Sequence, residues 1–189
     1  MEIVLIRHGK PKIDFSGKMS ASNFGKRVAS YDQSGIDAEH QPTAEAYERA
    51  GKCEFIVCST LPRSIESAWA LNIETPDIIS PLFRECEMPY ANWKYPELTG
   101  TSWSALFRIL QRVGYTSNTE SYKDIKCRTR ECTDQLVKLS KEHESVLFVG
   151  HGAIIWFIHK QLLRLGWSGP QKSVRKYWGF GVYTQNTPF

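Results

Sequence analysis

Several features that would narrow the interpretation are absent from this sequence of 189 residues. No apolar run approaches the ~18 residues of a membrane span, because His151 and two glycines interrupt the longest one, residues 146–158. No cluster of Lys and Arg forms a stripe for nucleic acid. The 24 Lys and Arg exceed the 20 Asp and Glu only slightly, for a net charge of +4. We therefore expect neither a membrane nor a nucleic-acid partner.

Paired metal-ligand and disulfide motifs are also missing. The five cysteines are odd in number and include no C-x-x-C pair, and Cys127 and Cys132 have no second pair at zinc spacing. No carboxylate cluster suits magnesium, so we expect no metal and no cofactor. The apolar run 3–6 follows Glu2 and is too short for a signal-peptide core. The sequence thus favours a cytoplasmic protein whose cysteines are reduced and mostly buried.

What the sequence does contain is an alternation of strands and helices. Apolar runs at 2–6, 54–58 and 145–149 lack polar alternation, as strands buried on both faces of a parallel sheet do. Weaker strands are expected at 77–79 and, nearer an edge, at 177–184. Helices are expected at 42–50, from 59 or 60 to about 71, at 119–143 and at 153–165. This order predicts an α/β fold with a central, mainly parallel sheet, a three-layer α/β/α sandwich.

Local signals set the expected starts of two helices. Pro42 occupies a first-turn position of one, and Ser59 or Thr60 is expected to cap the other, with Pro62 in its first turn. Two stretches are less regular. Residues 10–41 are expected to form a loop with one short helix. Residues 86–118 are expected to be an insertion that covers the sheet rim within a single domain, 1–189.

Charged and titratable residues follow the three strong strands. The first strand ends in Arg7-His8-Gly9, the second leads from Ser59 to Arg63, and the third ends in Gly150-His151-Gly152. Ligands of open α/β sheets bind beyond the carboxyl ends of the strands, so these groups are aimed at one rim. Helix N-termini there add backbone donors for an anion.

These residue types suit phosphoryl transfer. The arginine fork matches phosphate oxygens, and it is always charged. A histidine beside two arginines is favoured in its neutral form, because protonation would place like charges together. A neutral imidazole among phosphate-binding groups is a potential nucleophile towards phosphorus. A second histidine would hydrogen-bond the transferring group and disperse its charge.

The same segments resemble the histidine phosphatase superfamily, the phosphoglycerate mutase-like proteins. Residues 5–9 look like its R-H-G signature, residues 59–68 are similar to its S-x-L-x-R-x-x-x-[ST]-A element, and residues 149–152 resemble its late G/S-H-G motif. An R-H-G tripeptide alone is weak, but three elements in order, each after an expected strand, are specific. The resemblance implies a metal-independent phosphatase that hydrolyses a phosphomonoester through a phosphohistidine.

The resemblance also implies a role for each matching residue. His8 would be the nucleophile, Arg7 and Arg63 would hold the phosphoryl oxygens, and His151 would complete the phosphate pocket. The family often places a glutamate in an L-x-E-like element as proton donor, and residues 82–85 fit it, so Glu85 is expected to be the acid. Glu87 is the rival, because alternation in an extended segment would aim both at the rim.

The sequence departs from the mutases of this family. After Gly9 it reads Lys10-Pro11-Lys12-Ile13-Asp14, and residues 41–46 replace the usual helix start. This favours a hydrolase acting on a small phosphorylated substrate. A mutase-type phosphoryl transfer, a protein phosphohistidine phosphatase and a non-catalytic phospho-ligand binding protein remain alternatives. Trp93, Tyr95 and Trp103 either line a substrate cleft or pack the insertion. The oligomeric state is left open.

Overall fold

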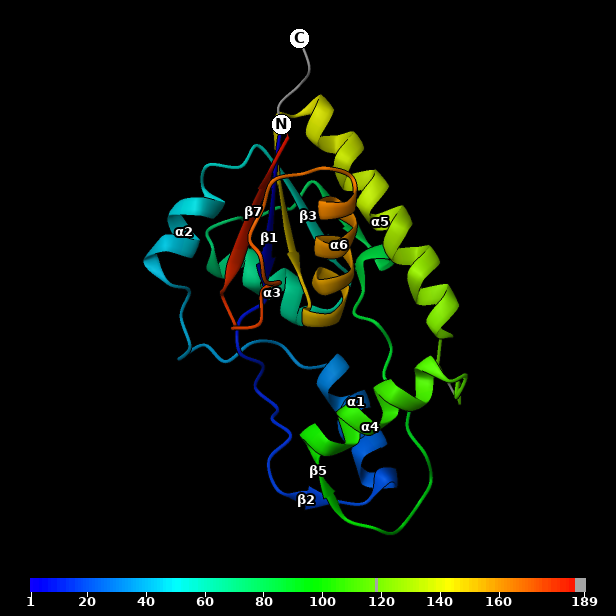
Figure 1. Cartoon of the computed structure of the whole chain (residues 1–189). Coiled ribbons are helices and arrows are strands. Elements are labelled where there is room, and N and C mark those ends of the chain that lie inside the picture. The colour runs from blue at the N-terminus through cyan, green and yellow to red at the C-terminus, as the bar shows by residue number, and fades with distance from the viewer. Residues whose placement is uncertain (118, 186–189) are drawn as a thin grey trace.

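A central sheet of five strands organises the computed structural model, which describes residues 1–117 and 119–185 (Figure 1). The strand order is β4-β3-β6-β1-β7. Neighbouring strands run parallel except β7, which pairs antiparallel with β1 at one edge. The bounds are β1 Glu2–Arg7, β3 Phe55–Ser59, β4 Ile78–Ser80, β6 Ser145–Gly150 and β7 Phe180–Thr184. The sheet is therefore mainly parallel, as the sequence predicted.

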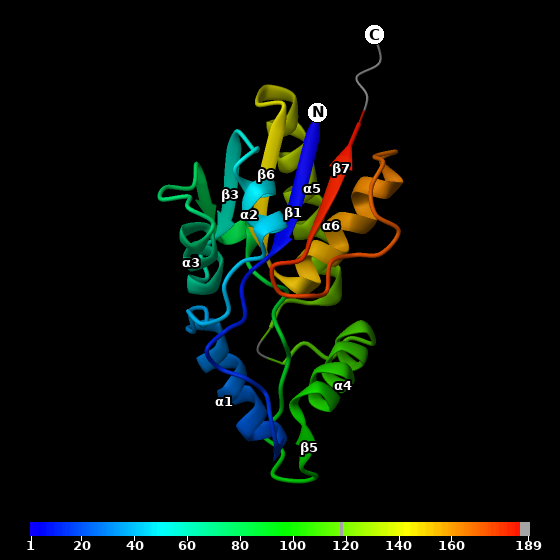
Figure 2. The same ribbon diagram turned by 90° about the vertical axis from the view of Figure 1, so that its left-hand side faces the viewer.

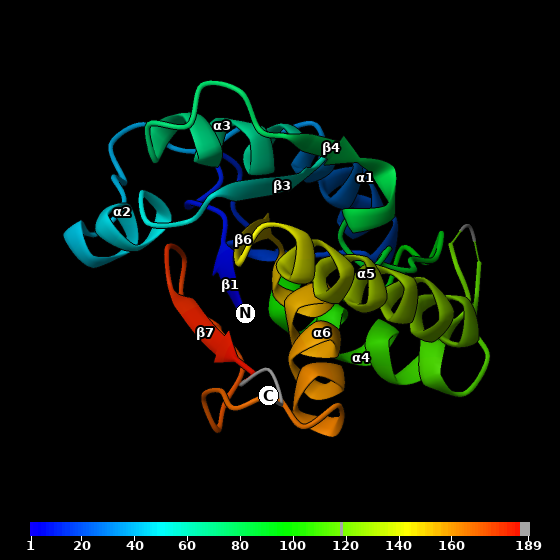
Figure 3. The ribbon, with the colours of Figure 1, turned by 90° about the horizontal axis from the view of Figure 1, so that it is seen from above.

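Helices cover both faces of this sheet and make the three layers of an α/β/α fold (Figure 3). Alternate residues of β1 face opposite layers: Ile3 and Leu5 pack with α5 and α6, whereas Val4 and Ile6 pack with α2 and α3. The continuous apolar strands are needed because both faces are buried. The helix bounds are α2 Ala44–Ala50, α3 Pro62–Ala70, α5 Tyr122–Glu142 and α6 Gly152–Arg164.

Two expected helix starts were wrong. Helix α2 is capped by the Thr43 side chain and not begun by Pro42, which precedes the cap. Helix α3 has Leu61 as its N-cap residue, with no side-chain cap, although Pro62 does open its first turn. Neither Ser59 nor Thr60 caps it. The Ser59 hydroxyl instead contacts His151, which is 92 residues away. Local sequence signals do not reveal that His151 competes with the helix start for this hydroxyl.

An additional unit lies beyond the carboxyl ends of the strands (Figure 2). It combines α1 Ala21–Asp32 with α4 Gly100–Arg112 and a small sheet of β2 Lys18–Met19 and β5 Leu98–Thr99. Phe24 of α1 and Phe107 of α4 belong to one buried cluster. The segment 86–118 thus packs against residues 15–31, and residue 118 lies outside the described residues.

The aromatic residues of this unit mostly pack it together. Trp103 is fully buried and donates a hydrogen bond to the Met19 carbonyl, at 2.7 Å. Trp93 packs on Trp103, whereas Tyr95 is 82% exposed. Core packing is therefore the outcome for Trp103.

Membrane-spanning helices and disulfides were not expected from the sequence. Within 1–117 and 119–185, no helix is long and apolar enough to cross a membrane. All five cysteines are free thiols, of which Cys127 is exposed and Cys58, Cys86 and Cys132 are buried.

Candidate active site

The carboxyl ends of β1, β3 and β6 bring the predicted site residues together. Parallel pairing sets Arg7 beside Gly150, and the His8 N–H donates to the Gly150 carbonyl at 2.9 Å. The rings of His8 and His151 consequently lie 5.1 Å apart, centroid to centroid. Both histidines are buried, as is Arg63 in the first turn of α3. The adjacency follows from register, because neighbouring parallel strands end at the same edge.

The hydrogen bonding of His8 determines which ring nitrogen carries its proton. Nδ1 lies 2.7 Å from the Gly9 carbonyl oxygen, which only accepts hydrogen bonds. Nδ1 therefore donates, and in the neutral ring Nε2 has the free lone pair. Burial, followed by the positive charge of Arg63, lowers the pKa of His8 to about 3. The ring is neutral at pH 7, with a nucleophilic Nε2.

Gly9 is held in place by contacts that a side chain would break. Its N–H donates to the Ser67 hydroxyl at 2.9 Å. A Cβ at this position would lie 2.4 Å from the buried Trp178 ring. Only glycine allows this approach, and the approach fixes the carbonyl that orients His8.

His151 is oriented by a serine from the neighbouring strand. The Ser59 hydroxyl lies 2.6 Å from Nε2, and it also accepts the Leu61 N–H at 3.2 Å. When the hydroxyl donates its proton to Nε2, the neutral ring carries its own proton on Nδ1. Burial, followed by the charge of Arg63, holds the pKa of His151 well below its ordinary value.

The two arginines are fixed by groups that leave some of their donors free. Arg63 donates to the Tyr31 carbonyl at 2.9 Å and to the Asp32 carboxylate at 3.1 Å. Arg7 donates to the Arg175 carbonyl, and its guanidinium lies 4.2 Å from the centroid of the Tyr177 ring. These contacts use only part of the five N–H groups of each guanidinium.

Three buried nitrogens of this cluster have no hydrogen-bond partner in the described structure. They are Nε of Arg7, Nε of Arg63 and Nδ1 of His151. Buried polar groups are normally paired, and leaving one unpaired costs about 1–3 kcal/mol. Both arginine nitrogens are donors, and His151 Nδ1 is one in the orientation that Ser59 favours. The arrangement therefore suits an oxyanion that offers several acceptors at once.

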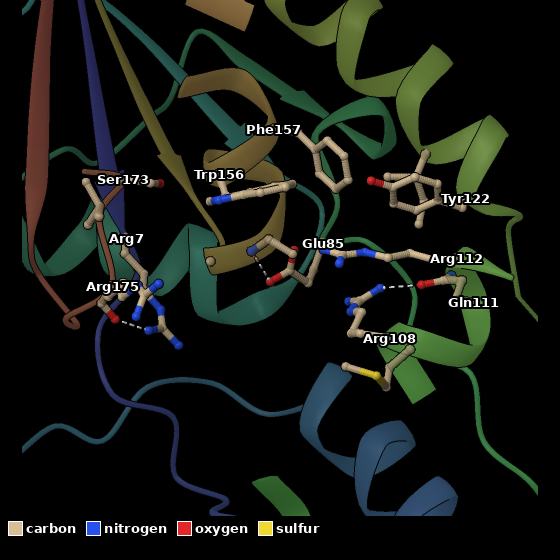
Figure 4. A pocket seen from close by; sticks show the side chains of 15 residues that line it. Arg7, Glu85, Arg108, Gln111, Arg112, Tyr122, Trp156, Phe157, Ser173 and Arg175 are labelled. Carbon is tan, nitrogen blue, oxygen red and sulfur yellow. Dashed lines mark hydrogen bonds between the residues drawn. The ribbon is translucent and has the colours of Figure 1, made fainter. Parts of the chain in front are cut away.

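Glu85 lies beside this cluster and caps helix α6 from outside. Its Oε2 accepts the Ala153 N–H at 3.1 Å, and its Oε1 accepts the N–H groups of Ile154 at 3.0 Å and Cys86 at 2.9 Å. Because His151, the N-cap residue of α6, makes no side-chain cap, Glu85 supplies the missing acceptors. Glu85 and Arg7 both line a cavity of about 540 Å³ (Figure 4).

Glu87 makes different hydrogen bonds from Glu85. Its Oε2 accepts the Glu120 N–H at 2.9 Å, while its own N–H donates to Glu120 Oε1. It is exposed and does not line the cavity of about 540 Å³, but it lines a second cavity, of about 240 Å³, together with Arg7, Arg63 and Glu85. The two glutamates thus differ in their hydrogen-bond partners, although both line a cavity with Arg7 and Arg63.

Sequence reasoning missed the residues that hold these groups in position. Tyr31 and Asp32 end α1, and Arg175 and Tyr177 precede β7, so both pairs are far in sequence from the motifs. No local pattern indicated them, because their contacts exist only once these segments fold over the sheet edge. Ser59 was part of a motif, but its contact with His151 was not foreseen.

The family model of the histidine phosphatase superfamily (branch 1) matches residues 3–177. No curated protein sequence matches.

Three similar solved structures, each less than 25% identical to this chain, show its fold. A mycobacterial glucosyl-3-phosphoglycerate phosphatase is 22% identical with a TM-score of 0.57, over 86% of this chain and 79% of its own. A putative α-ribazole-5′-P phosphatase of Escherichia coli is 15% identical with a TM-score of 0.61, over 98% and 91%. A phosphoserine phosphatase variant of Entamoeba histolytica, in complex with phosphoserine, is 19% identical with a TM-score of 0.54, over 86% and 80%.

Proposed function

Because the chain belongs to the histidine phosphatase superfamily, we propose that it hydrolyses a phosphomonoester through a phosphohistidine on His8. The observation that carries this proposal is the set of three unpartnered buried nitrogens, on Arg7, Arg63 and His151, beside a neutral histidine. A phosphoryl group carries the oxygen acceptors that these groups need. The same groups would bind the phosphoryl oxygens more tightly as charge develops in the transition state.

The first step transfers the phosphoryl group to His8. The Nε2 lone pair forms a bond to phosphorus, and the bond from phosphorus to the ester oxygen breaks with its electron pair on that oxygen. The Nδ1–H donated to the Gly9 carbonyl stabilises the positive charge that develops on the ring. The departing oxygen takes a proton from Glu85, which must therefore begin the cycle protonated.

The contacts of Glu85 indicate which oxygen would carry that proton. A carboxylate offers about four lone-pair positions. Two positions on Oε1 are used by Ile154 and Cys86, and one on Oε2 is used by Ala153. Oε2 keeps one position free, so it would hold the proton and give it to the leaving oxygen.

The second step returns the enzyme to its starting state. Water, deprotonated by Glu85, forms a bond to phosphorus while the bond to Nε2 breaks and its electron pair returns to the ring. The proton taken from water restores the Glu85 acid, as microscopic reversibility requires. Water and not an alcohol is the proposed acceptor, because the segments after Gly9 and around Gln41 depart from the mutases.

A small phosphoester fits the site better than a protein surface does. His8 is only 1% exposed, and α1, α4 and the loop before β7 surround the rim (Figure 2). A bulky phosphoprotein would have to displace these elements to reach Nε2. The proposed substrate is therefore a small molecule.

Single-turnover labelling with a ³²P-labelled phosphoester tests the proposal. The wild type should turn over and acquire an acid-labile, base-stable label, and the His8→Ala variant should do neither. A matched control is His143→Ala, since this histidine follows α5 and stacks on Phe55, at the end of the sheet opposite the cluster. Turnover by His8→Ala at the wild-type rate would contradict the mechanism, and a wild type that hydrolyses no phosphoester would contradict the function.

A further inference from the structure

The segment that carries Glu85 is not held in place by secondary structure. Residues 84–90 lie in neither a helix nor a strand. Within 1–117 and 119–185, no backbone N–H donates to the carbonyls of residues 84–87. Main-chain carbonyls of a folded protein are normally paired, and here side chains from other elements supply the donors. The position of the Glu85 carboxylate therefore depends on those side chains.

Arg128 of α5 holds this segment from one side. Its Nη1 donates to the carbonyls of Leu82 and Arg84 at 2.8 and 2.9 Å, and its Nη2 donates to the Glu85 carbonyl at 3.4 Å. Nε and Nη2 donate to the two oxygens of the Glu120 carboxylate, at 2.9 and 2.6 Å. All five N–H groups of this guanidinium are thus used within the protein.

Glu120 fixes Arg128 and also binds the far end of the same segment. The side chains of this ion pair are only 16% and 19% exposed. Glu120 Oε1 accepts the Glu87 N–H at 3.1 Å, and Glu87 Oε2 accepts the Glu120 N–H at 2.9 Å. Paired, charge-assisted hydrogen bonds between a guanidinium and a carboxylate fix the orientation of both groups. The main chain on both sides of Glu85 is therefore bound to the Arg128–Glu120 pair.

Arg128 takes part in this arrangement without lining the site. It is not among the residues that line the cavities of about 540 and 240 Å³. Arg108 donates to the carbonyls of Cys86 and Glu87, but it lines both cavities. Arg128 thus separates support of the segment from contact with a substrate.

We propose, on the basis of the proposed function, that Arg128 is a positioning residue, which places the proton donor Glu85 against the leaving oxygen. Proton transfer requires Oε2 to lie within hydrogen-bond reach of that oxygen. Without Arg128, three carbonyls lose their donor and the main chain at Glu85 shifts to find others. A misplacement of about 1 Å at a reacting group costs up to ~10²-fold in rate. Binding of the phosphoryl group is unaffected, because Arg128 makes no hydrogen bond to His8 or Arg63.

The leaving group distinguishes this role from a general loss of structure. Arg128→Met should lower kcat/KM for butyl phosphate by roughly 10- to 100-fold. It should lower kcat/KM for nitrophenyl phosphate much less, because nitrophenolate leaves without a proton. An equal loss for the two substrates, or no loss for either, would overturn the inference.

Two further variants keep the test decisive. Arg128→Lys retains a charge beside Glu120 but cannot span the carboxylate and the carbonyls, so it should show the same selective loss even if Arg128→Met does not fold. Arg49→Met is the matched control, because Arg49 of α2 forms an ion pair of similar burial with Glu2, which begins β1 and lies at its opposite end from His8. It should keep the wild-type ratio of the two rates.

A double variant tests whether Arg128 acts through Glu85. In a Glu85→Gln background, the Arg128 substitution should lower butyl phosphate hydrolysis by less than about 2-fold, since residues that act as one unit are not additive. The full additional loss would overturn the inference. A wild type that hydrolyses neither phosphate would instead contradict the proposed function, and an unselective loss in Glu85→Gln itself would contradict Glu85 as the acid.

Discussion

Replacing His8 by glutamine removes a group whose protonation the folded state opposes. In the folded protein, burial and then the charge of Arg63 lower its pKa to about 3, against an ordinary value of 6.5. Because the folded pKa is the lower one, the unfolded chain binds this proton first as the pH falls. The stability that depends on the neutral ring is therefore complete above pH 6.5 and is lost as the pH falls towards 3.

The size of this loss follows from the two pKa values. At pH 5 the unfolded ring has gained its proton and the folded ring has not. The pH then lies about 1.5 units below the unfolded pKa, and each unit corresponds to about 1.4 kcal/mol. Folding at pH 5 is thus disfavoured by about 2 kcal/mol through His8 alone, compared with folding at pH 8.

Urea unfolding at pH 8 and pH 5, in a buffer free of phosphate, measures this difference. The free energy of unfolding of the wild type should fall between these values by about 2 kcal/mol more than that of His8→Gln. His40→Gln, which replaces an exposed histidine, should resemble the wild type. His151 is present in all three proteins, so its own contribution largely cancels. Equal losses in the wild type and His8→Gln would refute the assignment of a buried, neutral His8.

Three other predictions concern the proton donor, metals and the second histidine. Glu85→Gln should lower the rate of alkyl phosphate hydrolysis by ~10²–10⁴-fold and that of nitrophenyl phosphate much less, because nitrophenolate leaves without a proton. In the matched Glu87→Gln variant, steady-state kinetics should show almost no difference between the two substrates. If only Glu87→Gln loses alkyl phosphate hydrolysis selectively, Glu87 is the proton donor. Dialysis against EDTA should leave the steady-state rate unchanged, and a strict requirement for added magnesium would contradict the mechanism. Ser59→Ala should lower the free energy of unfolding by about 1–3 kcal/mol, because the buried Leu61 N–H and His151 Nε2 lose their partner; urea unfolding measures it, and an unchanged stability would show that this contact is unimportant.

The sequence by itself determined the architecture and the position of the candidate site. Three apolar strands without polar alternation require burial on both faces, which only a sheet between two helical layers provides. Parallel strands that neighbour each other end at one edge, so the residues after them meet there whatever the loops do. That is why Arg7, His8 and His151 could be placed together from their positions at strand ends, and Arg63 from the helix start that follows.

Local signals were less reliable wherever a distant segment competed for the same group. Ser59 has the side chain of a helix cap, yet its hydroxyl binds His151 of a neighbouring strand, and Leu61 takes the cap position. Likewise, the burial of Trp103 depends on α1, a helix from an earlier part of the chain. A capping preference of about 1 kcal/mol does not decide between such partners.

Only the tertiary structure decided how the chemistry is arranged within the site. Glu85 and Glu87 are two residues apart in an extended segment, and the sequence offers both to the rim. Folding gives them different partners, because the uncapped start of α6 provides two N–H donors for Glu85, while Glu87 accepts the Glu120 backbone N–H. The sequence also did not predict which ring nitrogen of His8 carries the proton. That choice depends on the Gly9 carbonyl, whose position is fixed by Ser67 and Trp178. Such choices depend on hydrogen-bond geometry between segments far apart in the chain, which a pattern along the sequence does not record.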